Sequence, residues 1–310
     1  MKAVVKRLLA RLGYSLVVAK KAFRYVPEEQ PRAEPDDELG RFREVVSDPL
    51  NLLIDRVPEA GYIDRDGYVV LHNGHRVAPE GEHAYYGRFS DILVINRGVH
   101  EPLEEFVFQE LLRTLSGGTP VMIELGAYWA HYSMWLKKVC PGATCIMVEA
   151  DERKVPVGRG NFARHGYRGE FIQQWVSNDG FRLDMFVAER QLQTVDILHC
   201  DIQGYETVMI EHAQQTFKER RIGSAFISTH GEDIHHAIAS KLTALGYRIE
   251  VSSPYEQHTT SHDGFIFATS PDRVPLFTSF TPLGRVEINR ASTAELIDYV
   301  QRVRASRYHH

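Results

Sequence analysis

Residues 120–131 read Pro-Val-Met-Ile-Glu-Leu-Gly-Ala-Tyr-Trp-Ala-His, and this stretch decides the fold. An apolar run ends in an acid, Glu124, and a turn glycine, Gly126, follows before a helical pattern begins. The pattern predicts a strand, a tight turn and a helix whose N-terminal N–H groups point toward a bound ligand. It is not a dinucleotide fingerprint, because G-x-G-x-x-G requires three glycines.

The two acids at the ends of the first two predicted strands narrow the choice of ligand. A carboxylate two residues before the turn glycine disfavours a pyrophosphate and suits a cationic or hydroxyl-rich group, both of which S-adenosylmethionine carries. Glu149 ends the next strand, 144–149, at the interval where an acid accepts hydrogen bonds from a ribose diol. We expect Glu149 to bind the ribose, Glu124 to face the methionine or ribose end, and Gly126 and Tyr128 to contact the cofactor from the turn.

A third stretch, Val195-Asp-Ile-Leu-His-Cys-Asp-Ile-Gln-Gly-Tyr-Glu206, carries a family resemblance. It resembles the FkbM family of S-adenosylmethionine-dependent methyltransferases, whose fourth strand typically ends Lys-x-Asp-x-Glu-Gly-x-Glu. Three positions match, while His199 stands where lysine is usual and Gln203 where glutamate is usual; the matching residues are Asp201, Gly204 and Glu206.

Three further segments extend the resemblance over roughly residues 92–270. They are Arg97-Gly-Val-His-Glu-Pro-Leu-Glu-Glu-Phe106, Ile227-Ser-Thr-His-Gly231 and His262-Asp-Gly-Phe-Ile-Phe-Ala268. The resemblance implies a class I methyltransferase fold and O-methyl transfer from S-adenosylmethionine to a hydroxyl of a sugar, a glycan or a glycosylated small molecule.

Alternating strand and helix patterns predict an α/β fold with a doubly wound, Rossmann-like parallel sheet. The last two strands are joined by a polar loop without a helical pattern, so they should pair antiparallel. The seven strands are expected at 120–125, 144–149, 170–176, 195–200, 223–229, 247–251 and 264–269.

The catalytic domain is expected at residues 116–275, after an N-terminal extension of helices and strands. Residues 1–39 should form an amphipathic helix and a linker, 40–115 a cap, and 276–310 a helical tail that begins its last helix after Ser292. Within the cap the patterns predict a helix at 40–57, strands about an Asp-Gly turn at 62–71, a short strand at 92–96 and a helix at 101–115.

Composition limits the partners and the compartment. The 310 residues carry a net charge of −5, which gives no basic footprint for nucleic acid. No apolar run approaches the roughly 20 residues of a membrane span, and the three cysteines lack a C-x-x-C pattern, which favours a reducing, cytoplasmic setting. Homo-oligomerisation is left open.

Further candidate site residues follow the later strands, since ligands of open α/β sheets bind at the carboxyl ends of strands. Asn178 or Asp179 would bind the adenine amino group, with Trp175 or Val176 beside the ring. Asp201 would border the cofactor and orient His230 as the base; alternatively Asp201, Glu206 and His230, with Gln203 or Asp263, would ligate Mg²⁺. The acceptor is expected at residues of the cap region, namely Tyr85, Arg97, His100 and Glu101.

Two other functions compete with the methyltransferase prediction. A nicotinamide-dependent oxidoreductase would use the same kind of sheet, but the missing glycines and the terminal antiparallel pair disfavour it. A non-catalytic member that only binds a cofactor or a partner would explain the departures at His199 and Gln203.

Overall fold

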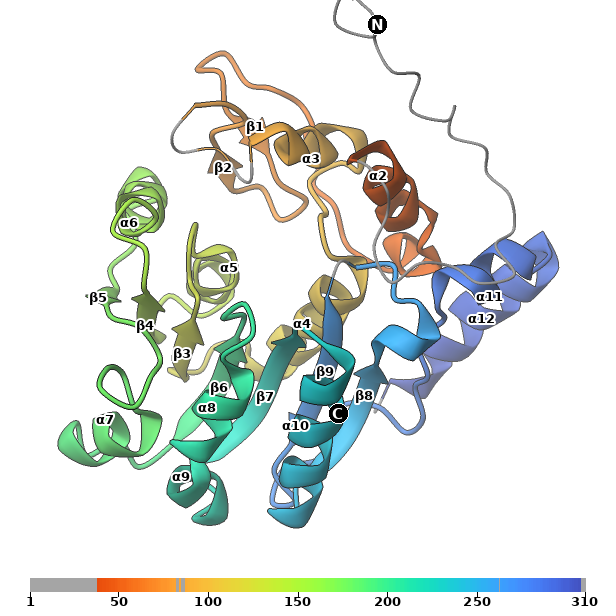
Figure 1. Ribbon diagram of the computed structural model, residues 1–310. Helices are drawn as coiled ribbons and strands as arrows, with labels where there is room; N and C mark the ends of the chain where they lie inside the picture. Colours follow the sequence, from red (N-terminus) through yellow and green to blue (C-terminus); the bar gives the residue numbers. More distant parts are fainter. Residues whose placement is uncertain (1–37, 82–83, 85–86, 262, 308–310) are drawn as a thin grey trace, which may run out of the picture. The chain divides into compact units, whose positions relative to one another are not determined.

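The computed structural model describes residues 38–81, 84, 87–261 and 263–307. Its main element is a seven-stranded sheet in the order β5-β4-β3-β6-β7-β9-β8 (Figure 1). Neighbouring strands from β5 to β7 pair in parallel, whereas β9 runs antiparallel to both β7 and β8. The predicted fold class is therefore confirmed. The strands are β3 (Val121–Leu125), β4 (Thr144–Glu149), β5 (Glu170–Gln173), β6 (Val195–Cys200), β7 (Ile222–Thr229), β8 (Arg248–Ser253) and β9 (Gly264–Thr269).

Two apolar cores lie on the two sides of this sheet because successive side chains of a strand point to opposite faces. In β3, Met122 belongs to one core and Ile123 to the other. The first core also holds side chains of α4 (Pro102–Leu115), α5 (His131–Val139), α6 (Val155–Arg164) and α12 (Thr293–Ser306). The second holds side chains of α7 (Leu183–Glu189), α8 (Glu206–Glu211), α9 (Gln214–Lys218) and α10 (Glu232–Ala244).

The segment before α4 packs on the first core and supplies short elements only. They are α2 (Glu38–Ser47), the 3-10 helices η1 (Pro49–Leu52) and η2 (Gly87–Ser90), α3 (Asp91–Ile95), and the two-stranded pair β1 (Val69–Val70) and β2 (Arg76–Val77). The other short elements, η3 (Tyr255–Gln257) and α11 (Arg285–Arg290), follow β8 and β9. In the described part of the chain no helix is both long and apolar enough to cross a bilayer.

Some sequence predictions fail at short elements. The strand expected at 92–96 is wrong, because this apolar run forms helix α3, which buries Ile92 and Leu93 and leaves Val94 and Ile95 exposed. Four apolar residues in a row do not distinguish a buried strand from a helix. The helix expected at 40–57 is divided at Asp48 into α2 and η1, and the strand expected at 170–176 ends at Gln173.

Other local predictions are confirmed. Ile63 bridges Val69 across the Asp66-Gly67 turn, although β1 continues into a pair with β2. Ser292 caps α12 by accepting a hydrogen bond from the Glu295 N–H group. The amphipathic helix and linker expected before residue 38 and the side chain of Tyr85 lie outside the described residues.

Asp48 links the start of η1 to the loop that precedes β9. One carboxylate oxygen accepts a hydrogen bond from the Leu50 N–H group at 2.8 Å, and the other accepts from the Thr260 hydroxyl at 2.6 Å. The side chain is buried, and this burial raises the pKa of Asp48 to about 6, although both hydrogen bonds oppose the shift.

Because the pKa of Asp48 is higher in the folded than in the unfolded state, its contribution to stability is present below pH 4 and disappears as the pH rises through about 6. The loss should reach about 3 kcal/mol for a shift of this size. We expect Asp48→Asn to gain stability relative to the wild type between pH 4 and pH 7. Urea unfolding across this range measures the difference, with the exposed Asp298→Asn as a control that should show a constant difference.

Candidate functional site

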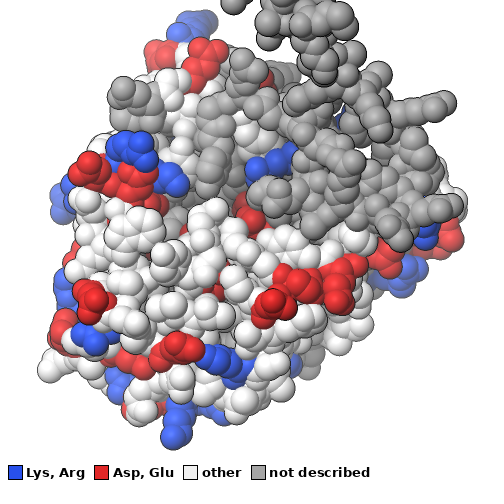
Figure 2. Space-filling model, in the orientation of Figure 1, with Lys and Arg blue, Asp and Glu red and all other residues white. Residues whose placement is uncertain are grey.

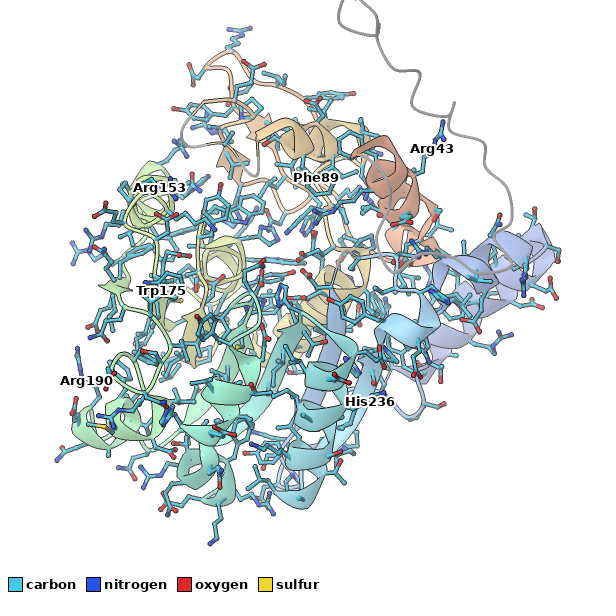
Figure 3. The ribbon with its side chains drawn as sticks, viewed as in Figure 1. Arg43, Phe89, Arg153, Trp175, Arg190 and His236 are labelled. Carbon is cyan, nitrogen blue, oxygen red and sulfur yellow. The ribbon has the colours of Figure 1, made fainter. Side chains whose placement is uncertain are left out.

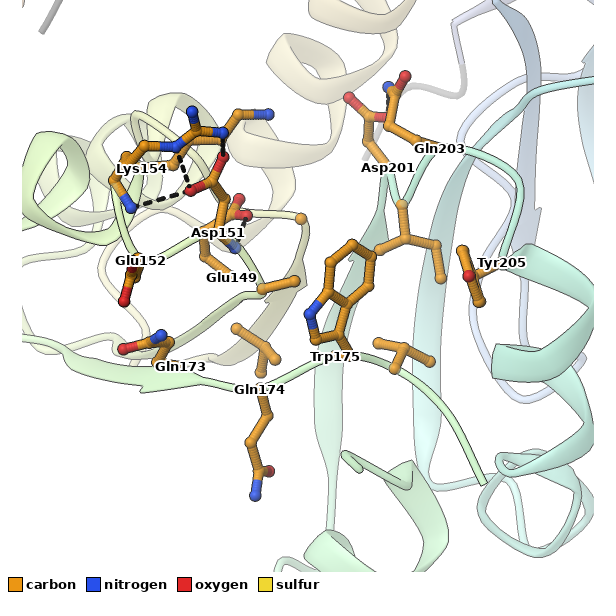
Figure 4. Close-up of a pocket in the computed structure, with 16 residues that line it drawn as sticks. Glu149, Asp151, Glu152, Lys154, Gln173, Gln174, Trp175, Asp201, Gln203 and Tyr205 are labelled. Carbon is orange, nitrogen blue, oxygen red and sulfur yellow. Dashed lines mark hydrogen bonds and ion pairs between the residues drawn. The ribbon is translucent and has the colours of Figure 1, made fainter. Parts of the chain in front are cut away.

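A cavity of about 600 Å³ opens at the carboxyl ends of β3, β4, β5 and β6 (Figure 4). This is the position at which open α/β sheets bind their ligands. Its lining comes from the β3 turn, the segment after β4, the end of β5 and the segment after β6, and comprises Gly126, Val148–Lys154, Gln173–Val176, Asp201–Gln203 and Tyr205.

Glu149 is held at the wall of this cavity by two backbone groups. One carboxylate oxygen accepts the Tyr128 N–H group at 2.9 Å, and the other accepts the Asp151 N–H group at 2.9 Å. A carboxylate oxygen has two acceptor sites, so each oxygen keeps capacity for one more donor. The arrangement suits two adjacent hydroxyl groups, as the sequence predicts for a ribose diol.

Gly126 is required by the close approach of the β3 turn to the end of β6. Its φ is +77°, and a Cβ atom there would lie 1.7 Å from the Asp201 carbonyl oxygen. The Asp201 N–H group also donates to the Leu125 carbonyl at 2.9 Å. The glycine is thus needed for backbone packing as well as for ligand access, whereas sequence reasoning assigned it to the ligand alone.

Two residues after Gly126 hold left-handed conformations without being glycine. Tyr128 has φ of 39° and Ala130 has φ of 60°. Such conformations cost about 1–3 kcal/mol each and persist where the surroundings impose them, often at functional sites. The Tyr128 hydroxyl donates to the Ala84 carbonyl at 2.7 Å, which connects the turn to the cap.

Glu124 does not line the 600 Å³ cavity, although the sequence analysis expects it to face the cofactor. It shares with Met122 the side of β3 that faces α4 and α5, and its carboxylate accepts the Ser133 N–H group of the first turn of α5 at 3.2 Å. Burial raises the pKa of Glu124, while His199 and the Ser133 hydrogen bonds oppose the shift.

Two exposed aromatic residues stand at the 600 Å³ cavity on the side away from Glu149 (Figure 4). Trp175, after β5, is 59% exposed (Figure 3), and Tyr205, before α8, is 43% exposed; their ring centroids lie 5.9 Å apart. Exposed rings lining a cavity are suited to stack on a planar ligand such as adenine. Trp175, expected beside the ring, thus lines the cavity, whereas the sequence analysis does not single out Tyr205.

Asn178 and Asp179, expected at the adenine amino group, lie outside the lining of this cavity. Both are exposed, and the Asn178 carbonyl oxygen lies 2.8 Å from His212 Nε2 at the edge of the sheet. The chain turns away after Val176, whose bridge to Phe181 closes the segment on itself.

A second cavity of about 290 Å³ adjoins the first and is the candidate acceptor pocket. The two cavities share Gly126, Asp201 and Gln203. His100 and Glu101, expected on the acceptor side, line it, whereas Arg97 is exposed and lines neither cavity. The remaining lining is Arg41, Glu124, Ala127–Trp129, His131, Tyr132, His199 and Asp263.

The residues expected to carry the chemistry lie together: Asp201, which lines both cavities, contacts His230, which lines neither. His230 Nε2 lies 3.4 Å from an oxygen of Asp201 and 3.2 Å from one of Asp263, while Nδ1 lies 2.8 Å from Glu206. Gln203 donates to Asp201 at 3.0 Å. The sequence analysis names Asp263 only as a possible additional metal ligand, whereas the structure places it in direct contact with His230.

The charges around His230 affect its expected role as a base. Burial lowers the pKa of His230, but hydrogen bonds to Asp263 and Glu206 and the nearby carboxylates raise it more strongly, to about 11. Burial and the charge of Asp263 raise the pKa of Asp201. At neutral pH the free protein therefore holds an imidazolium here, which has no lone pair to accept a proton.

His199, which replaces the usual lysine, has a partner on α4. Its Nε2 lies 2.5 Å from a carboxylate oxygen of Glu104, and the Ser228 hydroxyl donates to the other oxygen at 2.9 Å. Burial raises the pKa of Glu104 to about 7, although the hydrogen bond from Ser228 opposes the shift. The replacement is thus accommodated by a buried polar contact.

Lys and Arg residues are interspersed with Asp and Glu residues over the face seen in Figure 2, and the described part of this face carries no continuous basic patch. Some of the visible basic residues have acidic partners, such as Arg153 with Asp151 and Arg190 with Glu170 (Figure 3). A polyanion would therefore find no extended basic surface on this face.

Comparison with protein-family models and with curated proteins found no match. Solved structures similar to this chain include the precorrin-6y C5,15-methyltransferase of Geobacter metallireducens GS-15, with 14% identity over 54% of this chain and 87% of that chain and a TM-score of 0.39. They also include M. capricolum TrmK in complex with S-adenosyl-homocysteine (13% identity, 64% of this chain and 82% of that chain, TM-score 0.38) and the METTL16 methyltransferase domain (10% identity, 53% and 64%, TM-score 0.42).

We expect Gly126→Ala to destabilise the fold strongly, because the new methyl group would overlap the Asp201 carbonyl and the backbone would also be strained. Gly117→Ala is the matched control, since Gly117 has φ of +81° and nothing within 4 Å of the added methyl group. The control should lose about 1 kcal/mol from backbone conformation alone. Equal losses of unfolding free energy in the two variants would show that the close approach to Asp201 is unimportant.

Proposed function

We propose that this chain is an S-adenosylmethionine-dependent methyltransferase that methylates a hydroxyl group of a sugar, a glycan or a glycosylated small molecule. The observation that carries the proposal is the position of Glu124. Its carboxylate accepts hydrogen bonds from backbone N–H groups at the start of α5. In dinucleotide-binding sheets the N–H groups at this place hold a pyrophosphate. Glu149 meanwhile keeps acceptor capacity for a ribose.

The charges lining the two cavities also favour a cationic ligand. Among the described lining residues there are seven carboxylic acids and three Lys or Arg residues. A dinucleotide would add two negative charges to this setting, whereas a sulfonium adds a positive one. The charges therefore disfavour the nicotinamide alternative, which the missing glycines also disfavour.

The two adjoining cavities fit a transfer between a cofactor and a separate acceptor. The larger would hold the cofactor, with Glu149 at the ribose and Trp175 and Tyr205 at the adenine. The smaller would hold the acceptor among Trp129, Tyr132, His100 and Glu101, since aromatic faces beside many polar groups suit a hydroxyl-rich sugar ring. The choice of a sugar hydroxyl rests on the FkbM resemblance.

When bound, S-adenosylmethionine supplies a methyl group whose bond to sulfur breaks as the acceptor oxygen attacks the carbon. The protein must hold this oxygen in line and accept the proton of the hydroxyl. Asp201 is the group best placed to accept that proton, since it lines both cavities and burial, with the charge of Asp263, raises its pKa to about 7. His230, held as an imidazolium 3.4 Å away, opposes this shift and so favours the Asp201 carboxylate that can accept the proton.

A divalent cation is the alternative for the same group. Asp201, His230 and Asp263 offer ligand atoms within 4.8 Å of one another, and Glu206 fixes the other ring nitrogen of His230. An imidazole ligand fits Mn²⁺ or another transition metal better than Mg²⁺, which prefers oxygen. A cation there would lower the pKa of the acceptor hydroxyl.

Glu149→Ala should weaken binding of S-adenosylhomocysteine by about 1.5–3 kcal/mol, because a charged acceptor of two hydroxyl hydrogen bonds is lost. Isothermal titration calorimetry measures this change. Glu152→Ala, which removes another acid from the lining of the same cavity, is the control and should bind nearly as the wild type does. Unchanged affinity in Glu149→Ala would remove the ribose assignment.

The competing cofactors can be compared in one thermal-shift experiment, since a specific ligand stabilises the folded state by mass action. S-adenosylhomocysteine should raise the melting temperature of the wild type, and NAD should not. Stabilisation by NAD alone would favour the oxidoreductase, and binding of S-adenosylhomocysteine without methyl transfer to any of a panel of glycosylated acceptors would favour the non-catalytic alternative.

Asp201→Asn and His230→Ala should each lower turnover by two orders of magnitude or more, in the range of lost acid-base catalysis, while affinity for S-adenosylhomocysteine changes little. Radiolabelled methyl transfer provides the assay. Turnover that is abolished by EDTA and restored by Mn²⁺ would assign the group to a metal, and turnover insensitive to EDTA would leave the proton-transfer role. Near-wild-type turnover of both variants would exclude both roles.

A further inference from the structure

Three buried residues from distant parts of the chain converge behind the acceptor pocket. His72 follows β1, Glu105 lies in the first turns of α4, and His131 is the first residue of α5. Each is at most 1% exposed. Each offers one ligand-type atom, and the three atoms lie within 4.8 Å of one another.

The polar atoms of this group are unsatisfied within the described part of the protein. Both ring nitrogens of His131 and both of His72 lack a hydrogen-bond partner there, and so does one oxygen of Glu105. His72 Nε2 and that Glu105 oxygen lie 2.8 Å apart, a separation at which they can share a proton or a cation. Buried polar atoms without partners cost about 1–3 kcal/mol each, so an arrangement with several of them calls for a further partner.

The second oxygen of Glu105 is fully occupied, which fixes the direction of the first. It accepts the N–H groups of His100 at 2.8 Å and Glu101 at 3.1 Å, and His100 Nδ1 lies 2.5 Å away. These contacts hold the carboxylate as outer partners hold a metal ligand. The unoccupied oxygen is thereby directed toward His72 and His131.

We propose that His72, Glu105 and His131 bind a first-row divalent transition metal of the Zn²⁺ type. Two imidazole nitrogens and one carboxylate are the ligands found at zinc and non-haem iron sites that keep an open position. Such an ion would satisfy the three unpaired groups together. The donor set distinguishes this site from the oxygen-rich group of Asp201, His230 and Asp263.

A proton shared between His72 and Glu105 would explain less of the geometry than a bound metal ion does. It would pair these two residues but leave both nitrogens of His131 unsatisfied in a dry environment. The His131 ring stacks on Trp129 with centroids 5.0 Å apart, and the His72 ring lies edge-on to Trp135 at 4.4 Å. These aromatic neighbours provide no hydrogen-bond acceptor for the remaining ring nitrogens.

The surroundings give the ion access and a function in the fold. His72 lines a separate cavity of about 640 Å³ together with Asn73 and Lys138, which provides a route of entry from that side. His131 lines the acceptor pocket on the other side. The ion would tie the cap, α4 and α5 together and fix the wall of the acceptor pocket; this inference does not depend on the identity of the cofactor.

The test uses the full chain, purified without metal-affinity chromatography, stripped with a chelator and titrated with Co²⁺. We expect visible absorption bands that saturate near one equivalent per chain, are displaced by Zn²⁺, and are lost in His131→Ala and in Glu105→Gln. His230→Ala and His236→Ala are the matched controls, because they alter the two other candidate groups and should keep the bands.

Circular dichroism establishes that each variant is folded. If His131→Ala and Glu105→Gln fail to fold, the test relies on the wild-type protein. X-ray absorption spectroscopy of its Zn²⁺ form should then show nitrogen and oxygen ligands that include two imidazoles. No saturable Co²⁺ binding by the wild type, or loss of the bands in His230→Ala rather than His131→Ala, would overturn the proposal. Methyl transfer is not part of this readout, so failure here is separate from failure of the proposed function.

Discussion

The close approach between the turn after β3 and the end of β6 is the constraint on which the site depends. Gly126 and the Asp201 carbonyl are so near that a single added carbon atom would overlap. This contact places the turn proposed to bind the cofactor directly beside the first residue after β6. Because β3 and β6 are adjacent parallel strands, their carboxyl ends meet at one edge, and both cavities share Gly126 and Asp201 for that reason.

The start of helix α4 extends this arrangement into the first core: Glu104 and Glu105 are buried in its first turns, and Glu101 immediately precedes the helix. Glu101, Glu104 and Glu105 contact Tyr132, His199 and His100 respectively. Buried charges of this kind are weak evidence for stability, since desolvation can exceed the attraction between partners. Glu101 lines the smaller cavity, and Glu104 and Glu105 contact His199 and His100 of its lining, so a role in the site explains these acids better than a role in holding the fold.

The strand order and the antiparallel pair were predictable because they follow from hydrophobic periodicity and connection type over long segments. Glu149 was predictable because it ends a strand at a known interval. Glu124 lines the smaller cavity and not the larger one, because it shares with Met122 the side of β3 that faces the helices. Asn178 and Asp179 lie outside the lining because the chain turns away after Val176, and the two-residue strands and α3 were below the length at which periodicity is informative.

The buried group at His72, Glu105 and His131 was not predictable, because its members are far apart in the sequence and each has an ordinary structural explanation alone. Only the fold shows that their unpaired atoms converge. The partners of His199 and Gln203, the two residues that differ from the FkbM pattern, were not predictable from the sequence either. His199 is matched by Glu104, and Gln203 keeps a hydrogen bond to Asp201, so each replacement has a partner inside the site. Asp201 and Glu206 contact opposite ring nitrogens of His230, so a single imidazole ring holds these acids beside the residue that both cavities share.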